Sequence, residues 1–525
     1  MRALLLAILL AVVFTSCHSG SDSSVRAIEG PNVLFIVVDD LRPDMIGALG
    51  GTGITPNLDR LVGSGATFTR AYCQQAICNP SRASFLTGRR PESLGIFDLD
   101  RTLTATAPDV VTLPQHFKSL GYRTMGIGKV FHHEEDRPES WSEPAQRPVA
   151  DNWHSPANRM LIRQKELRAQ GAGVSEDALR RASLGPPTER SLTLDEDHFD
   201  GQVAAEALRT LESLAVDPRP FFLAVGFSRP HLPFNAPAPY WDLYDPNLLP
   251  EPWPVEPPLG SPAIASTNFP ELRAYDGMPG SKLPEPWLAT QPISDAEGRQ
   301  LRHGYLAATS FVDAQIGKLL DKLDALELTE DTIVVILSDH GFKLGELGGW
   351  TKHTNYELDV RSALILRVPG RTPLPPILSF GAETDAPPEH RAVPGQRIEA
   401  LVELVDVFPT LCELAELPTP GGLEGISFAP LLSDPEQPWK SAAFSLYPRG
   451  ELDPTGVVGR TIRTRDHRLT VWRTEQGSVL GRELYDYRFD PIEVQNLADD
   501  PRYAEVAADL TQRLWGGWRE ALPPR

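Results

Sequence analysis

The chain has 525 residues, of which 41% are hydrophobic and 23% are charged, a composition typical of a globular protein with one large core and a smaller one. Its formal net charge of -20 at pH 7 argues against nucleic acid or another polyanion as a general partner, because long-range repulsion opposes such binding. An anionic substrate must therefore bind in a local pocket of basic side chains.

The N-terminus has the pattern of an export signal. Residues 1–17 contain an early arginine, an unbroken apolar run over residues 3–14 and small residues before Cys17. The run is too short for a spanning helix. TSC at its end resembles a bacterial lipobox, in which Cys17 becomes a lipid anchor; ordinary cleavage nearby is the alternative. Residues 18–29 then form a polar tether, and we expect a periplasmic protein or an outer-membrane-anchored lipoprotein in a bacterium.

Four cysteines are too few for a disulfide scaffold. Cys412 lies in the apolar helical pattern LVELVDVFPTLCELAEL, which predicts a buried thiol, with a disulfide as the alternative. Cys73 is predicted to remain a thiol. Cys78 lies in a different context that is considered below.

Three continuous apolar runs, at residues 32–38, 220–228 and 332–338, are typical of strands buried on both faces. Helical patterns lie between them, after Pro56, at residues 201–214 and from Gly304 onward. This alternation predicts an α/β fold with a mostly parallel sheet and helices on both faces.

The connections and the C-terminal third have a different character. Residues 144–194 are less regular, and the proline-rich residues 237–292 are predicted to form long ordered loops over one face. After residue 370 shorter strand patterns predict a smaller subdomain with an antiparallel sheet. We therefore divide the chain into a catalytic domain at residues 30–370 and a C-terminal subdomain at residues 371–525.

Acidic residues follow two of the predicted strands. Asp39 and Asp40 are adjacent, and keeping both ionised at the end of a buried strand requires a compensating cation. A solvated turn acid with a helix cap is the alternative for this pair alone. Asp339 and His340 end the second strand, and oxygen ligands from two strand ends suit Ca²⁺ or Mg²⁺ better than zinc.

The stretch ICNPSRASFLTG places Cys78 just before a predicted helix start, with Arg82 in the first turn. Such a position would stabilise an anionic oxygen near Cys78. The alternative is a small residue in a turn beside a surface cation.

Cys-x-Pro-Ser-Arg, followed by Thr-Gly-Arg at residues 87–89, resembles the signature of the type I sulfatases, and the resemblance covers most of the chain. It implies an alkaline-phosphatase-like fold. It also implies that a formylglycine-generating maturation enzyme oxidises Cys78 to Cα-formylglycine. The same resemblance implies one Ca²⁺ ion with these ligands: Asp39, Asp40, Asp339, His340 and an oxygen of the modified Cys78. Many sulfatases carry asparagine where His340 stands.

Three further segments resemble the sulfate pocket of that family. GKVFH supplies Lys129 and His132, RPHLPF supplies His231 opposite the leaving oxygen, and Lys352 in GGWTKHTNYE closes the pocket. Taken alone, Lys129 would be interpreted as a solvated cation and His132 as structural. The predicted catalytic set consists of these four residues, Lys129, His132, His231 and Lys352, together with Cys78 and Arg82.

The motifs GKVFH, RPHLPF and SDHGFKLGELGGWTK look most like the iduronate-2-sulfatase branch of the family. Leu347, where that branch commonly has histidine, and the Val-Arg-Ser-Ala sequence at residues 360–363 depart from its pattern. The resemblance implies a sulfated oligosaccharide or polysaccharide substrate with a 2-O-sulfated uronic acid.

The implied mechanism is in-line attack on sulfur by one hydroxyl of the hydrated aldehyde at position 78. Lys129, Lys352 and the metal hold the sulfate oxygens, and His231, or else Lys352, protonates the departing sugar oxygen. Loss of the second hydroxyl's proton toward His132 then expels sulfate. Two alternatives remain: a phosphonate or phosphodiester hydrolase of the same superfamily, and a non-catalytic glycan-binding lipoprotein.

Overall fold

The computed structural model describes residues 30–133, 137–267, 270–279, 293–372, 395–449 and 456–523. The predicted signal peptide and tether, at residues 1–29, lie outside this part of the chain. Within it, none of the helices combines the length and apolar character that crossing a bilayer requires.

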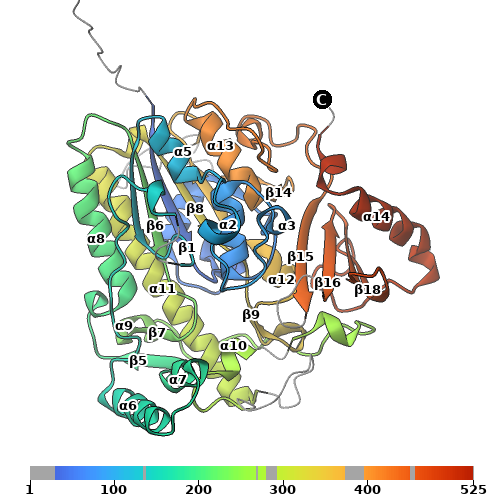
Figure 1. Cartoon of the computed structure of the whole chain (residues 1–525), viewed down its shortest axis with the longest axis horizontal. Coiled ribbons are helices and arrows are strands. Elements are labelled where there is room, and N and C mark those ends of the chain that lie inside the picture. The colour runs from blue at the N-terminus through green and yellow to red at the C-terminus, as the bar shows by residue number, and fades with distance from the viewer. Residues whose placement is uncertain are drawn as a thin grey trace, which may run out of the picture.

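A seven-stranded sheet forms the centre of the molecule (Figure 1). Its strands, in spatial order, are β13 (Gln396–Ile398), β2 (Ala66–Phe68), β12 (Leu364–Arg367), β8 (Thr332–Ser338), β1 (Asn32–Val38), β6 (Phe221–Phe227) and β4 (Arg123–Gly128). Only β12 is antiparallel to its neighbours in this sheet. The predicted mostly parallel, alkaline-phosphatase-like sheet is confirmed.

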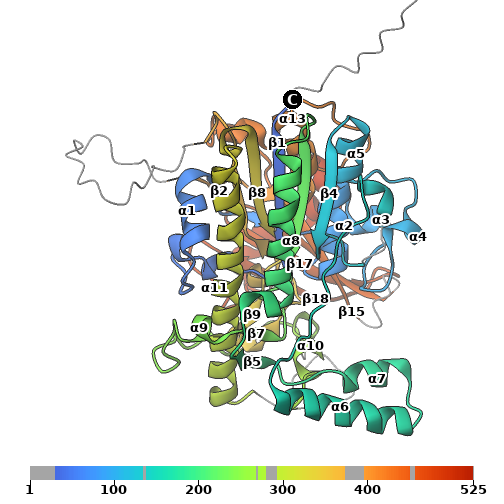
Figure 2. The same cartoon turned by 90° about the vertical axis from the view of Figure 1, so that its left-hand side faces the viewer.

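Both faces of the sheet are covered by helices, as predicted. Alternate residues of β1 pack into two separate cores. Val33, Phe35 and Val37 lie in one core, and Leu34, Ile36 and Val38 lie in the other. One core includes side chains of α2 (Cys78–Thr87), α5 (Leu113–Ser119) and α13 (Val407–Leu414). The other includes side chains of α1 (Pro56–Ser64), α8 (Phe199–Leu214) and α11 (Asp295–Ala325), which Figure 2 shows together on one side.

Helix α11 begins earlier than the pattern from Gly304 predicted. Ser294 accepts a hydrogen bond from the backbone of Glu297, and the Glu297 side chain accepts one from the backbone of Ser294. This capping box satisfies the amides of the first turn and fixes the start of the helix at Asp295.

The connections contain more regular structure than the sequence suggested. Residues 144–194 include α6 (Pro156–Gly171) and α7 (Glu176–Ala182). The remaining short helices are α3 (Pro91–Leu94), α4 (Leu103–Thr106), α9 (Ala238–Trp241), α10 (Pro270–Arg273) and α12 (Glu357–Val360). The remaining short strands are β3 (Ala71–Tyr72), β5 (Thr188–Ser191), β7 (Phe234–Pro237), β9 (Lys343–Leu344), β10 (Trp350–Thr351), β11 (Arg361–Ser362) and β14 (Val402–Glu403).

The C-terminal region contains the predicted antiparallel sheet. Its four strands are β15 (Ala443–Arg449), β16 (Val457–Arg463), β17 (His467–Thr474) and β18 (Val479–Asp486), and α14 (Ala504–Gly516) packs against them. Strand β13 follows the predicted boundary at residue 370 but pairs with β2 in the central sheet. The boundary itself stays a prediction.

Candidate active site

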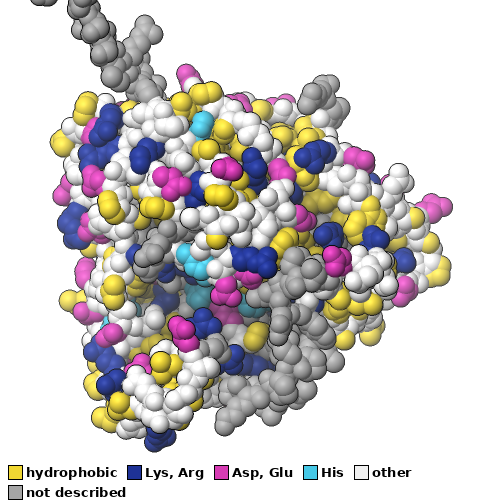
Figure 3. Space-filling model, in the orientation of Figure 1, with side chains coloured by type: hydrophobic (Ala, Val, Ile, Leu, Met, Phe, Trp, Pro, Cys, Tyr) yellow, Lys and Arg dark blue, Asp and Glu magenta, His cyan; other side chains and the backbone are white. Residues whose placement is uncertain are grey.

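The carboxyl ends of the parallel strands place the predicted residues at one edge of the sheet. Asp39 and Asp40 follow β1, Lys129 follows β4, His231 follows β6 and Asp339 follows β8. Because β1 pairs in parallel with both β6 and β8, these strands end at the same level. Figure 3 shows a hollow in which histidine, basic and acidic side chains gather.

Asp39 and Asp40 are completely buried. The backbone of Asp40 is in the left-handed region, at a φ of 62°, so the chain turns sharply after β1. Two hydrogen bonds hold this turn: the Asp40 amide donates to Asp339 Oδ1 at 3.2 Å, and the Tyr305 hydroxyl donates to the Asp40 carbonyl at 2.6 Å. The turn acid is therefore not solvated, contrary to the alternative for this pair alone.

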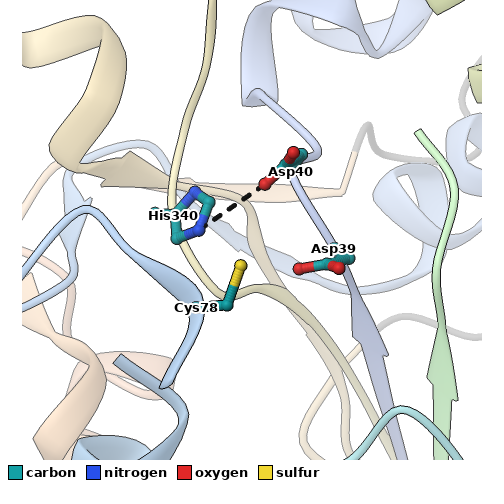
Figure 4. Close-up of side chains that lie close together, drawn as sticks. All are labelled: Asp39, Asp40, Cys78 and His340. Atoms are coloured by element: carbon teal, nitrogen blue, oxygen red, sulfur yellow. Dashed lines mark ion pairs between the residues drawn. The ribbon is translucent and has the colours of Figure 1, made fainter. Parts of the chain in front are cut away.

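Cys78 is the first residue of α2, at the positively polarised end of a helix whose residues are all buried. Its Sγ and one ligand atom each of Asp39, Asp40 and His340 lie within 4.8 Å of one another (Figure 4). These four residues come from three separate elements, and all are buried.

The donor set of this cluster fits a metal ion. His340 Nδ1 lies 3.0 Å from the Gly341 carbonyl, which only accepts, so Nδ1 carries a hydrogen and Nε2 is the ring nitrogen available to a metal ion. Nε2 is buried without a hydrogen-bond partner among the described residues and lies 3.5 Å from Asp40 Oδ1. A buried lone pair facing a carboxylate is unfavourable unless a cation lies between them.

Asp339 is not among these four residues, although it was predicted as a ligand. Its Oδ1 accepts hydrogen bonds from the backbone amides of Asp40 and His340, at 3.2 and 3.1 Å. Its Oδ2 accepts one from Arg82 Nε at 3.0 Å. Asp339 thus links the turn after β1 and the turn after β8 to Arg82. Its role as a metal ligand stays a prediction.

Arg82 is completely buried, so the alternative of a surface cation is wrong. Its guanidinium bonds Asp39 Oδ1 at 2.9 Å as well as Asp339, and Nη1 donates to the carbonyls of Lys129 and Val130. Because α2 begins at Cys78, Arg82 is its fifth residue and not in the first turn as predicted, and this one arginine connects the ends of β1, β4 and β8. Its charge offsets two carboxylates that would otherwise repel each other.

Two lysines complete the charge balance. Lys129 Nζ donates to Asp39 Oδ2, and Lys352 Nζ lies 2.9 and 2.8 Å from the two oxygens of Asp40. Burial alone would raise the pKa of Asp39, but Lys129 and Arg82 outweigh it and hold that pKa well below its usual value. Lys129 is 8% exposed, so it is not a solvated cation.

His132 lies beyond Lys129 in the loop after β4. Burial, with the charges of Lys129 and Arg82, lowers the pKa of His132 to about 2. Its Nδ1 has no hydrogen-bond partner among the described residues. The ring is therefore a neutral imidazole and a weak base in this setting, and its predicted role as a proton acceptor stays a prediction.

His231 contacts a residue that the sequence analysis missed. Its Nε2 lies 3.0 Å from Oε1 of Glu271, and the same oxygen lies 2.9 Å from Lys352 Nζ. Glu271 lies on the four-residue helix α10, in the proline-rich stretch between recognised motifs. No local pattern marks it, because only the path of this loop brings it to the site.

The unmodified thiol of Cys78 is a poor nucleophile. Burial and the charge of Asp39 raise its pKa well above the usual value, although Lys352 and Lys129 act in the opposite direction. Cys73 and Cys412 are buried free thiols, which confirms the prediction for both.

Comparison with known proteins identifies the family. The sulfatase family model matches residues 31–417 of this chain. The chain belongs to the sulfatase family. A model of the N-sulphoglucosamine sulphohydrolase C-terminal region also matches residues 387–519. This sulfatase, a sulfuric ester hydrolase, is 33% identical to iduronate 2-sulfatase of Mus musculus, with 92% of this chain and 94% of the relative covered, and 33% identical to that of Homo sapiens, with 94% and 95% covered.

Solved structures with lower identity share the fold. A phosphonate monoester hydrolase from Silicibacter pomeroyi has a TM-score of 0.68 at 23% identity, covering 94% of this chain and 96% of its own. A 2-O GAG sulfatase has a TM-score of 0.64 at 22% identity, covering 94% and 95%. The presence of both activities among these neighbours means that fold alone does not select the ester.

The position of Lys129 depends on a glycine in β6. A Cβ on Gly226 would lie 2.0 Å from the Lys129 carbonyl oxygen, and the Lys129 amide donates to the Gly226 carbonyl at 2.8 Å. We predict that Gly226→Ala lowers kcat for 4-nitrophenyl sulfate about 10- to 100-fold, because the backbone of Lys129 must move. Ala224→Gly on the same strand is the control and should leave kcat nearly unchanged. Full activity of Gly226→Ala would contradict this close packing.

Proposed function

We propose that this sulfatase hydrolyses the 2-O-sulfate ester of a uronic acid in a sulfated oligosaccharide or polysaccharide. The reaction would use a formylglycine formed from Cys78 and one bound Ca²⁺ ion. The observation that carries the proposal is the cluster of Asp39, Asp40, Cys78 and His340, in which a buried acceptor nitrogen faces two carboxylates beside the cysteine.

The ion would be held by the side chains of Asp39, Asp40 and His340 together with the modified residue at position 78, and by Asp339 as the further predicted ligand. Two carboxylates favour a hard divalent cation, which is the basis for Ca²⁺. When bound, the ion would polarise oxygen atoms of the sulfate ester and of residue 78.

Side chains of the protein would bind the sulfate and transfer the protons. Lys129 and Lys352 are buried cations beside Cys78, suited to hold the sulfate oxygens as negative charge shifts during S–O cleavage. His231 is partly exposed and is our candidate to protonate the sugar oxygen. His132, whose buried Nδ1 has no hydrogen-bond partner among the described residues, would take the proton whose loss expels sulfate and restores the aldehyde.

The sugar assignment rests on the relatives. The two iduronate 2-sulfatases align over almost the whole of both chains, including the C-terminal subdomain. Leu347 is buried and its backbone is left-handed, at a φ of 54°, so this departure from the expected motif lies in a tight turn rather than in the cluster.

We further propose that the protein is exported before or during maturation. Residues 1–17 would direct it to the periplasm, or Cys17 would anchor it as a lipoprotein. A formylglycine-generating enzyme would be its maturation partner, acting on Cys78 before α2 becomes buried.

Mass spectrometry tests the modification directly. In active enzyme, the peptide from Ala71 to Arg82 should contain an aldehyde or its hydrate in place of the Cys78 thiol, while Cys73 stays a thiol. Cys78→Ser and Cys78→Ala should lose sulfatase turnover with an unchanged thermal unfolding midpoint, because a serine ester has no second hydroxyl to release sulfate. An intact thiol at position 78 in fully active enzyme would refute the modification.

Metal removal tests the proposed ion. Dialysis against a chelator should remove one equivalent of calcium, measured by elemental analysis, and lower both turnover and the unfolding temperature, because Asp39 and Asp40 lose a counter-ion. Added Ca²⁺ should restore both properties. Enzyme that is fully active and contains no calcium before dialysis would rule out this ion.

A substrate panel tests the ester and the sugar. We expect turnover of a disaccharide with a nonreducing 2-O-sulfated uronic acid to exceed that of 6-O-sulfated and N-sulfated glucosamine by about 100-fold or more in kcat/KM, the size of effect expected when a pocket's polar groups go unpaired. A phosphonate monoester and a phosphodiester serve as competing substrates. Preference for either would overturn the sulfate assignment, and preference for another sulfated sugar would overturn the uronic acid.

A further inference from the structure

Glu271 lies between the two basic residues that face the leaving group. Its Oε1 is 3.0 Å from His231 Nε2 and 2.9 Å from Lys352 Nζ, and Lys352 also binds Asp40. Asp40, Lys352, Glu271 and His231 thus form a row of alternating acidic and basic side chains from the cluster around Cys78 to a partly exposed histidine. Alternating neighbours at these distances stabilise one another in a buried setting.

The contacts of His231 define where its protons are. Nδ1 lies 2.6 Å from the Leu232 carbonyl, which only accepts, so Nδ1 must donate. Nε2 faces Glu271 Oε1, which also accepts from Lys352. Each ring nitrogen of His231 therefore faces an acceptor, and these two contacts fix the orientation of the ring.

Glu271 is itself suited to remain a carboxylate. Burial would raise its pKa, but the charges of Lys352 and His231 outweigh burial and hold that pKa well below the usual value. Its third neighbour, His353, has Nε2 at 3.8 Å from Oε2, and burial lowers the pKa of His353 to about 3, so that ring is neutral. The partners that keep Glu271 a carboxylate are therefore Lys352 and His231.

We propose that Glu271 is a positioning residue for protonation of the leaving sugar oxygen: its Oε1 accepts the Nε2 hydrogen of His231 and so holds this proton donor beside Lys352 until the sugar oxygen takes the proton. This inference rests on the proposed function. As the S–O bond breaks, its electron pair goes to the sugar oxygen, which takes the Nε2 proton from His231. The Nε2 hydrogen bond to Glu271 breaks in this step, and the ring then regains a proton from water, since the side chain of His231 is 22% exposed. Glu271 keeps its bond to Lys352 throughout.

The leaving group distinguishes this role from a structural one. An aliphatic sugar oxygen needs a proton as it departs, whereas 4-nitrophenolate leaves with little assistance. Loss of correct sulfate binding would slow the hydrolysis of both esters, but loss of the proton donor would slow only the hydrolysis of the sugar ester. The ratio of the two rates is therefore the quantity to measure.

The experiment compares Glu271→Gln with the wild-type enzyme on 4-nitrophenyl sulfate and on the sugar sulfate that the wild type hydrolyses fastest. We expect kcat for the sugar sulfate to fall about 10- to 100-fold and kcat for the aryl sulfate about threefold or less. His231→Ala should show the same pattern, and the double variant should fall no further than His231→Ala. Glu271→Asp, which keeps the charge, should recover part of the sugar-sulfate rate.

Asp276→Asn is the matched control. Asp276 follows Glu271 in the same segment, but its ion pair is with Lys165, at 3.0 Å, and not with a residue of the cluster. It should leave both rates unchanged. Equal losses on both esters with Glu271→Gln, or additive losses in the double variant, would overturn the role of Glu271. A wild-type enzyme that prefers a sugar sulfate other than the uronide would overturn the sugar assignment alone, and the leaving-group comparison would still decide the role of Glu271.

Discussion

The pairing of Arg82 with Asp39 and Asp339 is the interaction on which the rest of this site depends. Three strand ends carry polar groups into a completely buried volume, where two carboxylates without a counter-ion would repel each other strongly. The guanidinium bonds both carboxylates and also two backbone carbonyls of the loop after β4. It thereby fixes the spacing of the strand ends as well as their charge.

The two lysines neutralise the acids in the same way as the arginine does. Lys129 pairs with Asp39, and Lys352 pairs with Asp40 and Glu271, so each acid near Cys78 has a basic partner within hydrogen-bond distance. An incoming sulfate and a divalent cation would enter a pocket in which both signs of charge are already arranged. Little reorganisation would then be needed during the reaction, which is the main electrostatic advantage of a preformed site.

The negative charge of the whole chain and the basic pocket are compatible because they act over different distances. The net charge of -20 repels polyanions over the range in which salt screening is incomplete. Within the pocket, Arg82, Lys129 and Lys352 act at contact distance and in a buried setting. Binding of an anionic sulfate ester is therefore a property of the pocket and not of the molecular surface.

The sequence by itself determined the buried strands of the sheet, because runs such as NVLFIVV have no polar face and must be covered on both sides. It also determined the cluster around Cys78 and the family, since those residues lie in contiguous motifs at strand ends. The start of α11 and the helices within residues 144–194 were not predicted, although each follows a serine cap, Ser294, Ser155 or Ser175, that is a local signal in the sequence. Only the tertiary structure decided the position of Glu271 and the engagement of Asp339 with Arg82. Both depend on the approach of segments far apart in the chain, and hydrogen-bond geometry at such contacts leaves no trace in local periodicity.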